Sequence, residues 1–225
     1  MKVCVLGSNG FIGSNILLCD PTWTGVTRQQ LDLTVQKDVD DFFQHNPFDV
    51  VIHCAVTGGS RLREDSGDVC YKNLLMFENV VRHVNKFQKL VYFSSGASKK
   101  GSPPTDPYGF SKWLIDQRIQ HLPNVYSLCI WGCYGAGEWS TRFSAVCKRD
   151  GHVVIPQDKY FDFIDVKEVA DIVHRYCTHG GEKFLNLTHP EKRKLSEWAG
   201  LFGATYTIQH DFLGEPYIST EEHNT

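Results

Sequence analysis

The chain has 225 residues, of which 41% are hydrophobic and 22% charged, and its formal net charge is −3 at pH 7. This length accommodates one well-buried domain with a small appendage rather than two large domains. The lysines and arginines are dispersed, so the sequence offers no basic surface to nucleic acid or an anionic membrane. No apolar run approaches the length of a membrane span, and the start Met-Lys passes directly into a strand-like run too short for a signal peptide. We therefore expect a cytoplasmic protein that binds neither nucleic acid nor membrane.

The eight cysteines predict buried thiols rather than disulfides or metal ligands. Disulfide frameworks are typical of small secreted chains with weak cores, whereas most of these cysteines lie within apolar runs. Cys129 and Cys133 have no matching pair, and no cysteine or carboxylate stands near His174 and His179 at a zinc-binding spacing. We expect no metal.

Apolar runs of strand length alternate with helical patterns through the first part of the chain. The expected elements are a strand at 3–6, a helix at 11–19, a strand at 25–28, a helix from about 36 to 43, a strand at 48–55, a helix at 71–86, a strand at 89–93, a helix at 108–121 and a strand at 125–131. Such alternation implies parallel βαβ units. The predicted fold is therefore α/β with a doubly wound parallel sheet.

Beyond Gly132 the alternation loosens. The expected features there are a loop at 135–141, a helix near 143–148, a segment at 161–166 leading into a helix at 166–177, a strand at 184–187 and a helix at 195–202. The last dozen residues are polar and predict a loose tail.

Glycines at positions 7, 10 and 13 stand where the first strand meets the first helix. At this point the pyrophosphate of a dinucleotide can approach backbone N–H groups and the N-terminus of a helix. Gly7 permits the tight turn, Gly10 the close approach of the ligand, and Gly13 the close packing of helix on strand. The spacing is G-x-x-G-x-x-G rather than G-x-G-x-x-G, and a purely structural glycine turn is the alternative.

Arg28, at the end of the predicted second strand, favours NADP over NAD. An acidic residue at this point accepts hydrogen bonds from the ribose of NAD, whereas an arginine pairs with the 2′-phosphate of NADP. A solvated surface arginine is the alternative. Asp32 and Leu33 follow closely and are expected to border the adenine.

Tyr108 and Lys112 lie four residues apart, so on a helix they share one face. A free phenol has a pKa of about 10 and is a poor proton donor or base at neutral pH, and a neighbouring ammonium lowers that pKa. The pair therefore predicts an acid or base for a reaction at a carbonyl or carbinol. Ser95, at the end of the preceding strand, is expected to hydrogen-bond the substrate oxygen, with Ser94 as the alternate. The glycine turn, the serine pair and the Tyr108–Lys112 spacing each occur commonly by chance. Their occurrence in this order along one chain is improbable by chance and favours a shared reaction.

Five segments together resemble the extended short-chain dehydrogenase/reductases, in particular the NAD(P)-dependent sugar-nucleotide epimerase/dehydratase family. They are residues 7–13, 93–97, 107–112, 134–135 and 161–166, and the resemblance covers about residues 1–200. It implies a Rossmann core at 1–132 and, at 133–225, a small, abbreviated substrate-binding part interleaved with the last elements of the core. It also implies a nucleotide-sugar substrate, a homodimer through helices 71–86 and 108–121, and Ser95, Tyr108 and Lys112 as the catalytic set.

On this resemblance the expected cofactor is NADP, with NAD as the alternative. The residues expected to contact it are Gly7, Asn9, Gly10, Phe11, Ile12, Gly13, Arg28, Asp32, Leu33, Cys54, Ala55, Val56, Tyr108 and Lys112.

Within that family, segments 26–33, 55–59 and 71–73 most resemble the GDP-fucose-synthase-like reductases, which epimerise and reduce a GDP-4-keto-6-deoxymannose with NADPH. Those enzymes carry a cysteine after the catalytic serine and a histidine in a later loop, as the pair for epimerisation. Here the first position is Ala97, and loop 135–143 contains no histidine. The predicted function is therefore NADP-dependent reduction of a nucleotide-linked 4-keto-6-deoxysugar. The alternatives are a C4 epimerase with tightly bound NAD and a non-catalytic cofactor-binding protein of the same fold.

Overall fold

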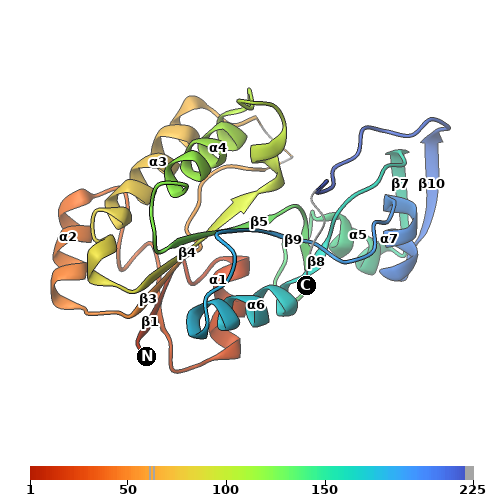
Figure 1. Cartoon of the computed structure of the whole chain (residues 1–225). Coiled ribbons are helices and arrows are strands. Elements are labelled where there is room, and N and C mark those ends of the chain that lie inside the picture. The colour runs from red at the N-terminus through yellow and green to blue at the C-terminus, as the bar shows by residue number, and fades with distance from the viewer. Residues whose placement is uncertain (61, 63, 221–225) are drawn as a thin grey trace. The chain divides into compact units, whose positions relative to one another are not determined.

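The computed structural model describes residues 1–60, 62 and 64–220 (Figure 1). The chain divides into two compact units. Unit 1 comprises Met1–Cys129 and Ala170–Leu185, and unit 2 comprises Ile130–Val169 and Asn186–Thr225. Each unit has its own apolar core.

A six-stranded sheet forms the centre of unit 1, in the strand order β2-β1-β3-β4-β5-β9. Its strands are β1 (Val3–Leu6), β2 (Thr24–Val26), β3 (Val50–His53), β4 (Lys89–Ser95), β5 (Val125–Ile130) and β9 (Phe184–Leu187). β1 pairs in parallel with both β2 and β3, and β3 pairs in parallel with β4. Every residue of β1 and β3 is buried, as expected for strands covered by helices on both faces.

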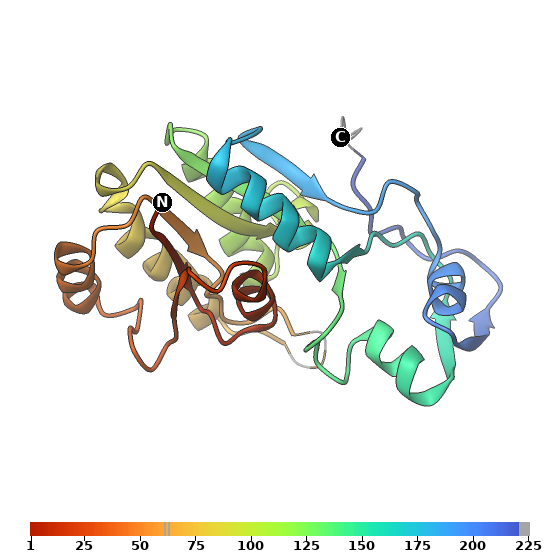
Figure 2. The same ribbon diagram turned by 90° about the horizontal axis from the view of Figure 1, so that it is seen from below.

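Helices cover the two faces of this sheet. They are α1 (Phe11–Cys19), α2 (Gln36–His45), α3 (Gly67–Val81), α4 (Pro107–Ile119) and α6 (Val166–Thr178), with short 3₁₀ turns at Val84–Lys86 and Gly96–Lys99. α3 and α4 lie side by side on one face, while α1 and α6 lie on the other (Figures 1 and 2). Between helix α3 and the sheet, the rings of Phe77 and Tyr92 meet edge to face with centroids 5.1 Å apart. The predicted doubly wound α/β fold is confirmed.

Unit 2 contains two small parallel sheets and two helices. β6 (Cys133–Tyr134) pairs with β8 (Ile164–Asp165), β7 (His152–Gln157) pairs with β10 (Thr205–His210), and the helices are α5 (Phe143–Asp150) and α7 (Leu195–Leu201). One core cluster of this unit is aromatic, with Phe161, Phe163, Trp198 and Tyr217 at its centre.

Three sequence expectations differ from the structure. The second strand ends at Val26 instead of residue 28, because Gln30 and Leu31 donate to the carbonyl of Thr27 and close a turn there. The long helix begins at Gly67 and ends at Val81, after which a separate 3₁₀ turn follows. The expected loose tail is wrong for Tyr217 and Ser219, which are buried, because Tyr217 packs on Phe161 and the N–H of Ser219 donates to Asp162 at 2.7 Å.

Within the part of the chain that the structure describes, no helix combines the length and the apolar character needed to cross a membrane.

Candidate active site

The glycine turn between β1 and α1 has two positions that tolerate no side chain. Gly7 has φ +78°, and a Cβ there would stand 2.7 Å from the backbone nitrogen of Ala55. A Cβ on Gly13 would stand 2.5 Å from the carbonyl oxygen of Gly7. A Cβ on Gly10 would meet the same oxygen at 3.3 Å, and no other atom is within 4 Å of it. The fold itself therefore requires Gly7 and Gly13, whereas the reason for Gly10 lies mostly outside the protein's own packing.

The position of this turn in the sheet is suited to a ligand. β1 lies between β2 and β3, so the chain crosses over the sheet in opposite directions from it, and open α/β sheets bind ligands at the carboxyl ends of strands at such a point. The N–H groups of Gly7 and Ser8 donate to the carbonyl of Val26 at 2.8 and 3.2 Å, and the N–H of Cys54 donates to Leu6 at 2.9 Å. These bonds bring the turn, the end of β2 and the end of β3 to one edge.

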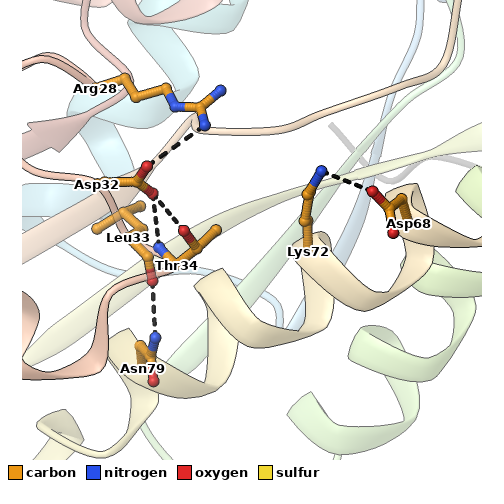
Figure 3. A network of polar contacts seen from close by, with 7 residues as sticks. All are labelled: Arg28, Asp32, Leu33, Thr34, Asp68, Lys72 and Asn79. Carbon is orange, nitrogen blue, oxygen red and sulfur yellow. Dashed lines mark hydrogen bonds and ion pairs between the residues drawn. The ribbon is translucent and has the colours of Figure 1, made fainter.

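Arg28 and Asp32 form an exposed pair just beyond β2 (Figure 3). The guanidinium of Arg28 is 3.4 Å from Asp32 Oδ2, and 76% of the Arg28 side chain is exposed. Asp32 Oδ1 accepts hydrogen bonds from the Thr34 N–H and hydroxyl at 2.9 and 2.7 Å. These bonds, together with the Arg28 charge, hold the pKa of Asp32 below its usual value. The arrangement keeps a cation on the surface beside a firmly ionised carboxylate.

Leu33 offers less to a ligand than its sequence position suggests. Its side chain is buried in the core of unit 1, and its carbonyl accepts a hydrogen bond of 2.8 Å from Asn79 on α3 (Figure 3). The amide of Asn79 thus fixes the segment after β2 against α3. Of the other expected contacts, Cys54 is half-buried, with burial raising the pKa of its thiol, while Val56 is exposed.

The start of α4 is set by an N-cap. The carboxylate of Asp106 accepts the N–H of Gly109 at 2.7 Å, and Pro107 occupies the first helical turn. Asp at the N-cap and Pro at the first helical position both favour a helix start. Tyr108 consequently lies in the first turn of α4, with Lys112 one turn further on.

Lys112 is buried, with 3% of its surface exposed. Its Nζ donates to the hydroxyl of Tyr92 at 2.8 Å and to the carbonyl of Phe93 at 2.6 Å, and it lies 5.7 Å from the ring centroid of Tyr108. Burial lowers the pKa of Lys112 to about 8, against the opposing effect of the Asp116 carboxylate. Lys112 therefore still carries its charge at neutral pH, and a cation this close to a phenol favours the phenolate.

The two serines that end β4 have different surroundings. Ser95 is half-buried, and its Oγ accepts the N–H of Ala97 at 3.2 Å. A hydroxyl that accepts this bond still has its proton to donate. Ser94 is buried and donates to Asp116 Oδ2 at 2.6 Å. The geometry favours Ser95 over Ser94 as the group that meets a substrate oxygen.

Two residues that touch the proton-transfer pair were missed in the sequence. Tyr92 is a buried aromatic residue of β4, a pattern that indicates core, and nothing in the sequence places its hydroxyl on Lys112. Gly59 has φ +75°, and a Cβ there would stand 2.9 Å from Cζ of Tyr108. The adjacent glycines Gly58 and Gly59 are the sequence signal that could have indicated this contact, because paired glycines often mark a turn or a close approach of the backbone.

The family assignment follows from a match over most of the chain. The model of the NAD dependent epimerase/dehydratase family matches residues 3–187. The chain belongs to that family, as the sequence motifs predicted.

Several solved structures share the fold. A dTDP-4-dehydrorhamnose reductase from Bacillus anthracis, solved with NADP, is 20% identical with a TM-score of 0.79, covering 100% of this chain and 90% of the other. A GDP-mannoheptose C4 reductase from Campylobacter jejuni with NADP bound is 17% identical with a TM-score of 0.78, and the match covers 100% of this chain and 93% of the other. A GDP-L-fucose synthetase from Naegleria fowleri bound to NADP is 13% identical with a TM-score of 0.78, and the match covers 96% of this chain and 83% of the other. A search of curated proteins gave no match. At these identities the likeness shows the fold.

The glycine turn yields a paired prediction about stability and cofactor binding. Gly13→Ala should lower the free energy of unfolding by about 1–3 kcal/mol, the usual cost of forcing extra atoms into a packed site. Gly10→Ala should lower it by less than Gly13→Ala does, because a Cβ on Gly10 meets the carbonyl oxygen of Gly7 at 3.3 Å instead of 2.5 Å. Urea unfolding followed by circular dichroism measures both changes. If Gly10 faces a pyrophosphate, Gly10→Ala should still weaken dinucleotide binding, and an unchanged affinity would assign this glycine no ligand role.

Proposed function

We propose that this protein catalyses the NADP-dependent reduction of a nucleotide-linked 4-keto-6-deoxysugar. The observation that carries the proposal is the buried ammonium of Lys112 beside the ring of Tyr108, in the same unit as a glycine turn at the switch point of a doubly wound sheet. The similar structures support it, because they include nucleotide-sugar reductases solved with NADP.

The cofactor fits the residues present. The turn at Gly7–Gly13 has no side chain at three positions, which would let backbone N–H groups approach a pyrophosphate. Arg28 carries an exposed cation beyond β2, where the 2′-phosphate of NADP is recognised in this fold. NADPH held by the glycine turn and Arg28 would supply the hydride for carbon C4 of the sugar.

The protein's own groups handle the proton. Tyr108 donates its phenolic proton to the C4 oxygen, and the charge of Lys112 stabilises the phenolate that remains. The hydroxyl of Ser95 donates a hydrogen bond to the same oxygen and orients the carbonyl. Ala97, together with a loop 135–143 that has no histidine, supports a single reduction without a preceding epimerisation.

Tyr108→Phe tests the proton donor. The variant should lose activity by about 10²–10⁴-fold in kcat, because the ring remains and the acid is removed. NADPH oxidation with nucleotide-linked 4-keto-6-deoxysugars measures turnover, and fluorescence titration with NADPH should show retained binding. Unchanged turnover would exclude Tyr108 as the acid. Sugar interconversion without net NADPH oxidation would indicate a C4 epimerase, and cofactor binding without any turnover would indicate a non-catalytic protein.

Arg28→Ala tests the cofactor preference. Loss of the guanidinium should raise the Kd for NADPH by about tenfold or more and leave that for NADH nearly unchanged. The matched control is Lys37→Ala, which removes the cation of another exposed i,i+4 pair, with Asp41 on α2. Equal losses for NADPH and NADH, or an equal effect of the control, would contradict a 2′-phosphate contact at Arg28.

We further propose a homodimer that forms through α3 and α4. Apolar side chains on these helices remain partly or fully accessible, among them Tyr71 on α3 and Phe110 and Trp113 on α4, whose rings stack 6.1 Å apart. Light scattering should give twice the mass of one chain, and Trp113→Glu should halve it. A monomeric wild-type protein would refute this interface.

Two further expectations stay predictions: that unit 2 is the substrate-binding part, and that the protein is cytoplasmic.

A further inference from the structure

Asp116 is a buried carboxylate held by three serine hydroxyls. Ser94 of β4 and Ser98 of the 3₁₀ turn donate to Oδ2 at 2.6 and 3.2 Å, and Ser127 of β5 donates to Oδ1 at 2.7 Å. A carboxylate accepts three such bonds without donating one, and the two shorter distances are typical of hydroxyls bound to a charged oxygen. In this geometry the three hydroxyls donate and the Asp116 carboxylate accepts.

A buried negative charge is unfavourable unless it is compensated. Asp116 lies four residues after Lys112 on α4, so the two side chains share one face of the helix. Both residues are buried, and the negative charge of Asp116 opposes the effect of burial on Lys112. The two side chains thus lie one helical turn apart in the interior.

Other titratable groups also surround Lys112. They are Tyr92 from β4, Tyr108 from α4, His53 and Cys54 from the end of β3, and Cys129 from β5. Burial lowers the pKa of His53 to about 4, so it is neutral at pH 7. Burial likewise raises the pKa of Tyr92 and of Cys54, which are also neutral. Among Asp116 and these groups around Lys112, the carboxylate is that of Asp116.

We propose that Asp116 is a positioning residue for the reaction: its buried carboxylate compensates the charge of Lys112 and ties α4 to β4, the 3₁₀ turn and β5. The inference rests on the proposed function, because Lys112 matters to catalysis through Tyr108. It gives a reason for Ser94, Ser98 and Ser127, whose hydroxyls hold the carboxylate in place. Asp116 itself touches neither substrate nor cofactor in this role.

The test compares three variants. Asp116→Asn removes the charge at constant size, Asp116→Glu keeps the charge, and Ser127→Ala removes one hydrogen bond while leaving the charge. The first readout is the titration of the Lys112 ¹³Cε resonance, assigned by its loss in Lys112→Met. The second is the pH profile of kcat for NADPH oxidation. The third is thermal unfolding.

Without the carboxylate, Lys112 should lose its proton at lower pH. In Asp116→Asn, both the Lys112 titration and the alkaline loss of kcat should move down by about one pH unit, as expected when a close opposite charge is removed. Asp116→Glu should restore both toward wild type. Ser127→Ala should lower the unfolding temperature with neither titration moved. A Lys112 titration in Asp116→Asn identical to that of wild type would overturn the proposal.

The resonance measurements also cover two other outcomes. If Asp116→Asn does not fold, the ¹³Cγ resonance of Asp116 in the wild-type protein decides, because a protonated carboxyl at pH 7 would overturn the proposal. If no nucleotide sugar is reduced, the proposed function fails, but the Lys112 titration still tests the charge compensation by itself.

Discussion

The burial of one cation, the ammonium of Lys112, is the constraint on which the arrangement of unit 1 depends. A charge in an apolar interior needs hydrogen-bond acceptors and an opposite charge. The hydroxyl of Tyr92 and the carbonyl of Phe93 supply the acceptors, and Asp116 supplies the charge. Because these groups come from β4 and α4, the lysine fixes how the helix that carries Tyr108 lies on the sheet.

The cofactor turn has a different physical basis. It depends on close approaches of backbone to backbone, which Gly7 and Gly13 allow by having no side chain. The proton-transfer pair depends instead on charge and hydrogen bonds. The two parts belong to one sheet, whose parallel strands bring their carboxyl ends to the same edge. The topology thus brings the glycine turn and the end of β4 to one edge of the sheet.

The sequence reveals those features whose signals are local. The glycine turn, the Tyr108–Lys112 spacing and the alternation of strands and helices each depend on residues close in the chain. The hydrogen bonds of Tyr92 and Asp116 span up to 22 residues, and neither residue type distinguishes a core position from a functional one. In unit 2, the strands β7 and β10 pair across about fifty residues, and Tyr217 is buried by contact with Phe161. Pairings of this range leave no periodic signal.

The alternation of β4 has a consequence for how this enzyme can change. Successive side chains of a strand point to opposite faces, so Ser94 faces the carboxylate under α4 while Ser95 does not. A shift of one residue in the pairing of β4 would exchange the two serines and expose the hydroxyl of Ser94 in place of that of Ser95. Insertions and deletions near this strand are therefore far more costly than substitutions, and variation in substrate preference has to arise in segments that leave its register intact.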